Sequence, residues 1–241
     1  MAEKIIIQNG FRNFRSENCL ERIFRRSLDM DYEQFITEIQ KYWDLRKKGL
    51  KKQANSFLFS FTKSFKENVP DADADAILFQ FCREYLDEMK FPGDVLPRRH
   101  LPFQLTKLLD DYLSRECEKN QMPQMRRAYQ IFGNIYNPHD PKLEHDFYPI
   151  LERAYMHEKC DPQTVQLYFR EQLDSLWWGQ HHFPEGSCIT KEEFENIVGS
   201  AKKILSEKTV EPQLVEEFEY YMKLYQVYFE WQNNNRIGDF Y

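Results

Sequence analysis

Glycine is scarce in this sequence, and long apolar runs are absent. Only 8 of the 241 residues are glycine, whereas sandwiches, barrels and doubly wound sheets need many tight turns, so the scarcity favours helices. No apolar run approaches the roughly 20 residues that span a bilayer, and the apolar patch within residues 4–8 is too short for the core of a signal peptide. We therefore expect a cytoplasmic protein that does not enter a membrane.

Familiar catalytic and metal-binding motifs are missing as well. The sequence contains no GxGxxG, GxxxxGK[ST] or GxSxG motif and no protein-kinase signature, which argues against the common nucleotide-binding folds. The five cysteines are far apart and include no CxxC pair, so neither a disulfide framework nor a zinc ribbon is indicated. The neighbouring Asp110 and Asp111 diverge if they lie on a helix and make a poor acid–base pair. We expect no cofactor, and the sequence favours binding over catalysis.

Charge is divided unevenly along the chain, whose formal net charge is −6. Residues 1–66 hold 14 Lys and Arg against 8 Asp and Glu, a net charge of +6. The remaining residues hold 19 against 31, a net charge of −12. Charge complementarity steers association, so residues 67–241 are suited to a basic partner.

Apolar residues recur at helical spacing from residue 16 onward, and the starts of the expected helices carry capping signals. Asp31 can cap one helix, and Thr190 with Glu193 forms a capping box before another. Proline recurs where a first helical residue would lie, because its missing N–H has no helical partner there. These prolines are Pro123, Pro141, Pro162 and Pro212.

The pattern predicts an all-α protein of about nine helices. Short connections favour stacked antiparallel helix pairs, arranged as an α-solenoid or as a compact α–α array. Residues 4–8 are β-prone and precede the turn dipeptide Asn9-Gly10, which predicts a short N-terminal extended arm or hairpin. We expect a single domain over residues 1–241, with any weak seam near residues 90–100.

Two adjacent tryptophans and two adjacent histidines form the first candidate site: Trp177, Trp178, His181 and His182. They stand at the end of an expected helix that opens with Asp161-Pro162. One interpretation is an aromatic binding surface with two imidazoles beside it. The other, which we favour from sequence, is that the tryptophans are mainly core and the histidines meet the negative end of the helix dipole.

Several residues of metal-ligand type lie between positions 139 and 182, and the set includes His139, Asp140, Glu144, His145, Asp146, His157 and Cys160. The His157–Cys160 spacing suits chelation, but the spacing from His145 to His157 fits no standard motif. Pro149 is expected to kink any helix between those two histidines. A metal-dependent enzyme is therefore only the third functional hypothesis, and we assign no metal ligands.

Basic residues define the second candidate surface: Arg12, Arg15, Arg22, Arg25, Arg26, Arg46, Lys47, Lys48, Lys51 and Lys52. Interleaved phenylalanines make a nucleic-acid surface an alternative. Solvated helix faces explain the same charges, and the sequence pI of about 5.6 favours that explanation.

The sequence therefore predicts a non-catalytic protein–protein interaction module, in one version an acidic protein that binds or masks a basic partner. Nucleic-acid binding through the basic N-terminal helices is the alternative. A metal-dependent enzyme using the histidine-rich region 139–182 is the third hypothesis.

Overall fold

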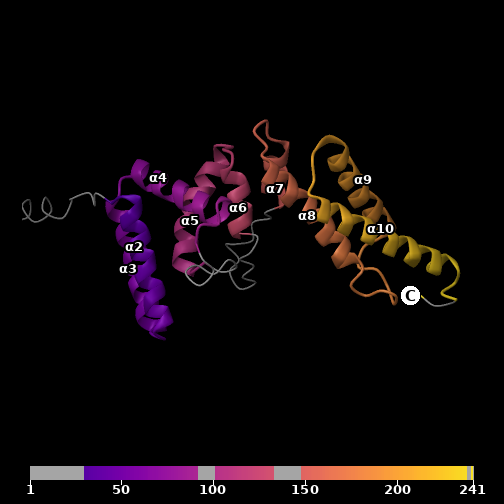
Figure 1. Cartoon of the computed structure of the whole chain (residues 1–241), viewed down its shortest axis with the longest axis horizontal. Helices are drawn as coiled ribbons and strands as arrows, with labels where there is room; N and C mark the ends of the chain where they lie inside the picture. The colour runs from indigo at the N-terminus through magenta and orange to yellow at the C-terminus, as the bar shows by residue number, and fades with distance from the viewer. Residues whose placement is uncertain (1–29, 92–100, 133–147, 238–239, 241) are drawn as a thin grey trace, which may run out of the picture. The chain divides into compact units, whose positions relative to one another are not determined.

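The computed structural model describes residues 30–91, 101–132, 148–237 and 240. In these residues the chain forms nine α-helices and one π-helical turn, and no strands (Figure 1). The predicted all-α class with paired helices is confirmed. The basic residues up to Arg26 and the expected N-terminal arm or hairpin lie outside the described part of the chain.

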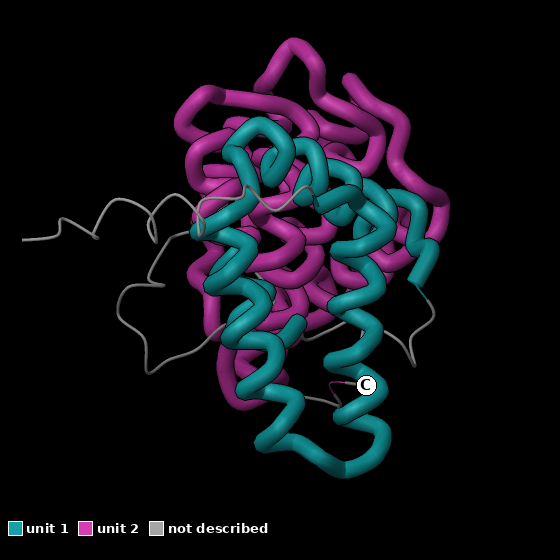
Figure 2. Tube along the Cα trace, turned by 90° about the vertical axis from the view of Figure 1, so that its left-hand side faces the viewer, with its two compact units in different colours: residues 1–108 teal, residues 109–241 magenta. Residues whose placement is uncertain are grey.

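The chain divides into two compact units, residues 1–108 and 109–241 (Figure 2). The division falls inside α5 (Phe103–Glu118) rather than near residues 90–100. The single domain remains a prediction, and each unit is described by itself below.

Unit 1 is built around a helical hairpin followed by a shorter helix. The bounds of its elements are α2 (Tyr32–Lys47), α3 (Lys51–Asn68), α4 (Asp71–Cys82) and the π-helical turn η1 (Arg83–Asp87). The aromatic ring of Phe35 packs against Phe61, Phe65 and Phe81 at centroid distances of 5.3–5.7 Å. Burial of these rings helps to hold the three helices together.

The predicted cap of α2 at Asp31 forms. The Asp31 carboxylate accepts a hydrogen bond from the Gln34 backbone N–H at 2.8 Å, and the Gln34 side chain accepts one from the Asp31 N–H at 3.1 Å. Two of the four orphan N–H groups of α2 are thereby satisfied.

Unit 2 is organised around helix α8 (Pro162–Gly179), which contacts three other helices. Its elements after α5 are α6 (Gln124–Phe132), α7 (Tyr148–Met156), α8, α9 (Lys191–Glu207) and α10 (Pro212–Asn233). Helix α8 packs against α7, α9 and α10 (Figure 1). Leu173 and Leu176 of α8 are fully buried in the shared core. Helix α8 is therefore the element on which the rest of unit 2 is assembled.

Prolines lie at or next to the starts of four helices of unit 2. Pro162 and Pro212 occupy the first turn of α8 and α10, as predicted. Helix α6 begins at Gln124, one residue after Pro123. The expected kink at Pro149 is wrong: α7 begins at Tyr148, so this proline lies in the first turn, where it breaks no helical hydrogen bond.

An ion pair between buried Arg126 and half-buried Asp161 joins α6 to the start of α8. Oδ1 of Asp161 accepts hydrogen bonds from the Thr164 N–H at 2.7 Å and the Thr164 hydroxyl at 2.8 Å. Its other oxygen, Oδ2, lies 3.0 Å from Nε of Arg126, whose side chain is buried. One carboxylate thus caps α8 and pairs a buried guanidinium.

Candidate protein-binding site on helix α8

Both tryptophans at the end of α8 lie on the surface of unit 2. Trp177 is 48% exposed and Trp178 is 56% exposed, so the interpretation that they are mainly core is wrong. The buried stripe of α8 runs through Phe169, Leu173 and Leu176. At 100° per residue, positions 177 and 178 both turn away from that stripe. The helical period alone therefore indicates that both tryptophans are exposed. The many aromatic residues of the sequence made a core position look more frequent.

The two tryptophans gather around His181, which is also exposed. The His181 ring stacks on Trp178 with an interplanar angle of 6° and a centroid distance of 6.0 Å. Its centroid lies 5.5 Å from that of Trp177 and 5.3 Å from that of His182. The structure therefore brings together all four predicted residues, and we call Trp177, Trp178, His181 and His182 the Trp–His cluster.

An open groove of about 510 Å³ begins at Trp178 and continues between α8 and α9. We call it the α8–α9 groove, and its lining residues are Asp174, Ser175, Trp178, Ile189, Glu193, Asn196 and Ile197. Ile189 and Ile197 are partly buried and supply apolar surface beside the indole. The sequence prediction missed every lining residue except Trp178, although Asp174 precedes it by four residues and so lies on the same side of α8.

The α8–α9 groove is acidic. Its described lining includes the carboxylates of Asp174 and Glu193 and no lysine or arginine. Hydrogen bonds from the Thr190 backbone and hydroxyl lower the pKa of Glu193, so its carboxylate carries charge at neutral pH. Desolvation raises the pKa of Asp174, against the attraction of Arg170.

Glu171 adds a further carboxylate one turn before Asp174 on α8. Burial raises the pKa of Glu171, and the neighbouring Asp174 charge raises it further. The Tyr129 hydroxyl of α6 donates a hydrogen bond to Glu171. On α10, Glu217 pairs with Arg170 at 2.5 Å. Glu171 therefore adds a carboxyl group near the groove, whereas the charge of Glu217 is offset by Arg170.

The end of α8 is held firmly by its neighbours. The buried Tyr225 hydroxyl of α10 donates a hydrogen bond to the Leu176 carbonyl at 2.9 Å. The Gly179 carbonyl accepts hydrogen bonds from the Cys188 N–H at 2.9 Å and the Ser187 hydroxyl at 3.2 Å. These bonds satisfy terminal carbonyls of the helix, so the Trp–His cluster is presented on an ordered scaffold.

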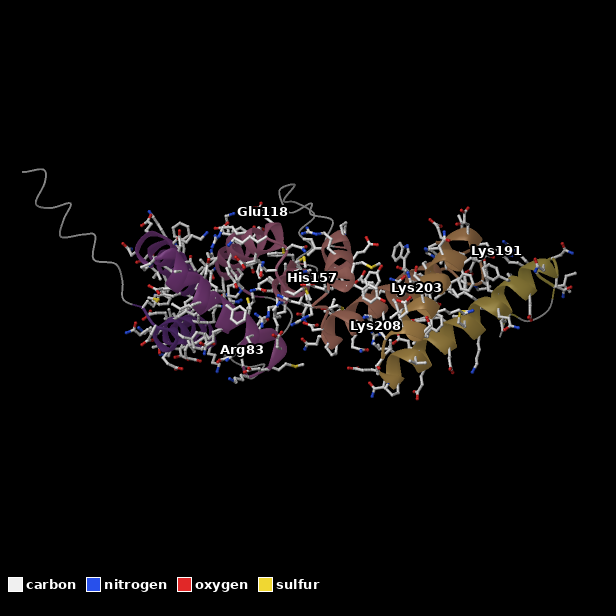
Figure 3. All side chains as sticks on the ribbon, turned by 90° about the horizontal axis from the view of Figure 1, so that it is seen from above. Arg83, Glu118, His157, Lys191, Lys203 and Lys208 are labelled. Carbon is white, nitrogen blue, oxygen red and sulfur yellow. The ribbon has the colours of Figure 1, made fainter. Side chains whose placement is uncertain are left out.

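Of the seven residues named for the metal hypothesis, His157 and Cys160 are described, and His139, Asp140, Glu144, His145 and Asp146 lie outside the described part of the chain. His157 follows α7 (Figure 3), and its Nδ1 accepts a hydrogen bond from the Lys159 N–H at 3.0 Å. Burial raises the pKa of the Cys160 thiol. Among the residues that the structure describes, no three His, Cys, Asp or Glu side chains are grouped as a metal site requires. The metal-dependent enzyme remains a hypothesis.

The described residues of the predicted basic surface belong to unit 1, whereas the residues of the α8–α9 groove belong to unit 2. Arg46 and Lys47 end α2, Lys48 follows it, and Lys51 and Lys52 begin α3. The five cations therefore surround a single turn.

Comparison with known proteins assigns no family. No protein-family model matches the chain, and no curated protein and no solved structure resembles it closely enough to count as a match. Within residues 30–91, 101–132 and 148–237, none of the helices has the length and apolar character needed to cross a bilayer. The function must therefore be argued from the geometry alone.

Proposed function

We propose that unit 2 is a protein-binding module whose α8–α9 groove receives a basic segment of a partner protein, with the Trp–His cluster as the anchoring surface. The observation that carries this proposal is the exposure of two adjacent tryptophans on an ordered helix end beside an acidic groove. Exposed apolar patches rimmed by polar residues are typical of interaction sites, and tryptophan is enriched among the residues that dominate binding energy.

The chemistry of the groove supports a cationic segment. A lysine or arginine side chain can lie over the face of Trp178 that His181 does not cover while its charge approaches Asp174. An adjacent apolar side chain of the partner can contact Ile189 and Ile197. Phosphate groups, by contrast, would meet two carboxylates, so the groove is unsuited to nucleic acid.

The distribution of charge along the chain supports the same partner class. Residues 67–241 carry a net charge of −12, which accelerates association with a basic protein at low ionic strength. Replacement of exposed Asp and Glu residues of unit 2 with Asn and Gln is expected to slow association with such a partner and to flatten its salt dependence.

Selection of a random peptide library on the immobilised full-length protein tests the proposal even though the partner is unidentified. We expect selected peptides to contain Lys or Arg next to an apolar residue, and a parallel selection on Trp178→Ala to lose this enrichment. For a selected peptide, Trp178→Ala is expected to weaken affinity by about 30-fold, the effect of a residue that contributes about 2 kcal/mol.

Two further variants make this experiment specific. Asp174→Asn removes one negative charge from the groove and is expected to weaken the same peptide. Tyr220→Ala is the matched control, because Tyr220 is an aromatic residue of unit 2 that is 60% exposed and does not line the groove. Selected peptides rich in acidic residues, or an affinity that Trp178→Ala leaves unchanged, would contradict the proposal.

A further inference from the structure

The outward side of α3 in unit 1 carries an exposed phenylalanine among lysines. Ala54, Leu58 and Phe65 are buried in unit 1. With 100° per residue, Lys52, Phe59, Lys63 and Lys66 lie together on the opposite side, within an arc of about 60°. All four side chains are exposed, and Phe59 is 59% exposed. We call these four residues the α3 lysine face; at 1.5 Å per residue it extends for about 21 Å.

The turn between α2 and α3 continues the positive charge of this face. Lys51 and Lys52 lie in the first turn of α3, which contains no acidic residue, and Leu50 at the N-cap makes no side-chain cap bond. Cations at a helix N-terminus oppose the helix dipole and are unfavourable for folding. Helix stability therefore does not explain their position, whereas contact with a negatively charged partner would.

Helix α3 itself carries four lysines and one glutamate, Glu67. Glu67 lies 3.8 Å from Lys63, and both side chains are exposed, so the pair is weak. Asp44 near the end of α2 accepts a hydrogen bond from Gln40 at 2.9 Å. The residues of α3 therefore carry a net positive charge although the whole chain is acidic.

The α3 lysine face combines three lysines with one exposed aromatic ring, and this combination suits some anionic partners better than others. An anionic membrane surface requires a broad apolar helix face, but the apolar face of α3 is buried in unit 1 and Phe59 is the one large apolar side chain on the α3 lysine face. Single-stranded nucleic acid uses both features, because lysines contact its phosphates and an exposed aromatic ring stacks on a base.

We propose that the α3 lysine face binds single-stranded nucleic acid, with Lys52, Lys63 and Lys66 along the phosphodiester backbone and a base stacked on Phe59. The chemistry is sequence-tolerant, because every base has a face that can stack. This site is independent of the α8–α9 groove, so neither proposal depends on the other.

Fluorescence anisotropy of the full-length protein with labelled oligo(dT) and oligo(U) tests this inference, using strands of about 15 nucleotides, within the range of site sizes of single-strand binding folds. Phe59→Ala is expected to weaken binding by about 5- to 150-fold, the range for loss of one stacked base. The double variant Lys63→Gln/Lys66→Gln is expected to reduce the slope of log affinity against log salt by about 1.4, because each contacted phosphate of a single strand contributes about 0.7.

A matched pair of lysines separates the α3 lysine face from overall charge. Lys202 and Lys203 of α9 are exposed, and Lys203 is labelled in Figure 3. Lys202→Gln/Lys203→Gln changes the net charge by the same amount as the α3 pair, and it is expected to leave both affinity and salt slope unchanged. An equal effect of the two pairs would overturn the proposed site.

Other outcomes are equally decisive. The proposal is overturned if neither oligonucleotide changes its anisotropy at low salt. It is also overturned if duplex DNA binds as tightly as single strands and its affinity is unchanged by Phe59→Ala. Binding to anionic phospholipid vesicles without binding to oligonucleotides would assign the α3 lysine face to membrane surfaces instead. Circular dichroism is expected to show unchanged helicity for Phe59→Ala, and the lysine pair tests the site even if that variant unfolds.

Discussion

Substitution of Gly179 by alanine tests the packing that supports the Trp–His cluster. Gly179 is the last residue of α8 and is buried. A Cβ atom at this position would fall well inside van der Waals distance of the Tyr225 hydroxyl and only 2.7 Å from the Ile189 side chain. The hydroxyl cannot withdraw without losing its hydrogen bond to the Leu176 carbonyl.

Three free-energy contributions determine whether Gly179→Ala stabilises or destabilises the protein. Alanine in place of glycine stabilises a helix by up to about 1 kcal/mol. Overpacking of a well-packed site destabilises by about 1–3 kcal/mol, and a buried hydroxyl that loses its partner adds about 1–3 kcal/mol. We therefore expect Gly179→Ala to lower the free energy of unfolding by about 1–5 kcal/mol.

The measurement is urea unfolding followed by circular dichroism, with Gly199→Ala as the matched control. Gly199 lies inside α9, and a Cβ there meets nothing within 4 Å, so its substitution is expected to stabilise by up to about 1 kcal/mol. The double variant Gly179→Ala/Tyr225→Phe removes the obstructing hydroxyl and is expected to destabilise by less than the sum of the two single changes. If Gly179→Ala stabilised the protein as Gly199→Ala does, the close approach of α10 to the end of α8 would be refuted.

Three further predictions concern the same unit. Asp161→Ala is expected to lower the free energy of unfolding by about 3 kcal/mol, because buried Arg126 loses its carboxylate and α8 loses its cap. Asp161→Asn keeps the cap and is expected to lower the free energy of unfolding by less. Equal losses for the two variants in urea unfolding would contradict this prediction. Trp177→Ala is expected to change the free energy of unfolding by less than about 1 kcal/mol. Leu176→Ala, at a fully buried position, is expected to lower it by about 2–5 kcal/mol. A larger loss for Trp177→Ala than for Leu176→Ala would place the indole in the core. Burial raises the pKa of Glu171 above its ordinary value of 4.5, so the stability that it contributes is present below pH 4.5 and is lost as pH rises through the folded pKa. Glu171→Gln is expected to flatten the fall in unfolding free energy as pH rises above 4.5, and identical pH profiles would exclude this role.

Helix starts were the most predictable features, because their chemistry is local. The capping box of Thr190 and Glu193 and the cap at Asp31 join residues three positions apart, and both form. Pro162 and Pro212 likewise stand at the first turns of their helices. Such signals depend on backbone groups within one turn, so they can be recognised without the tertiary structure.

The candidate site was only partly predictable. The four residues of the Trp–His cluster were identified together because their spacing of three to five positions brings them to one end of α8. Their environment was misjudged, since composition alone made a core position the more frequent outcome for tryptophan. Glu193 was recognised only as a capping residue, and its place in the α8–α9 groove depends on the packing of α9 against α8.

By itself, the sequence determined the all-α class, the positions of the main helix starts and the separation of charge along the chain, because periodicity, capping and composition are local properties. The tertiary structure decided which face of α8 is covered, and with it the exposure of Trp177 and Trp178. It also brought Asp161 to Arg126, 35 residues away, and the Tyr225 hydroxyl to the Leu176 carbonyl, 49 residues away. Such contacts depend on how helices distant in sequence pack against one another, and one helical stripe does not specify which neighbour will cover it.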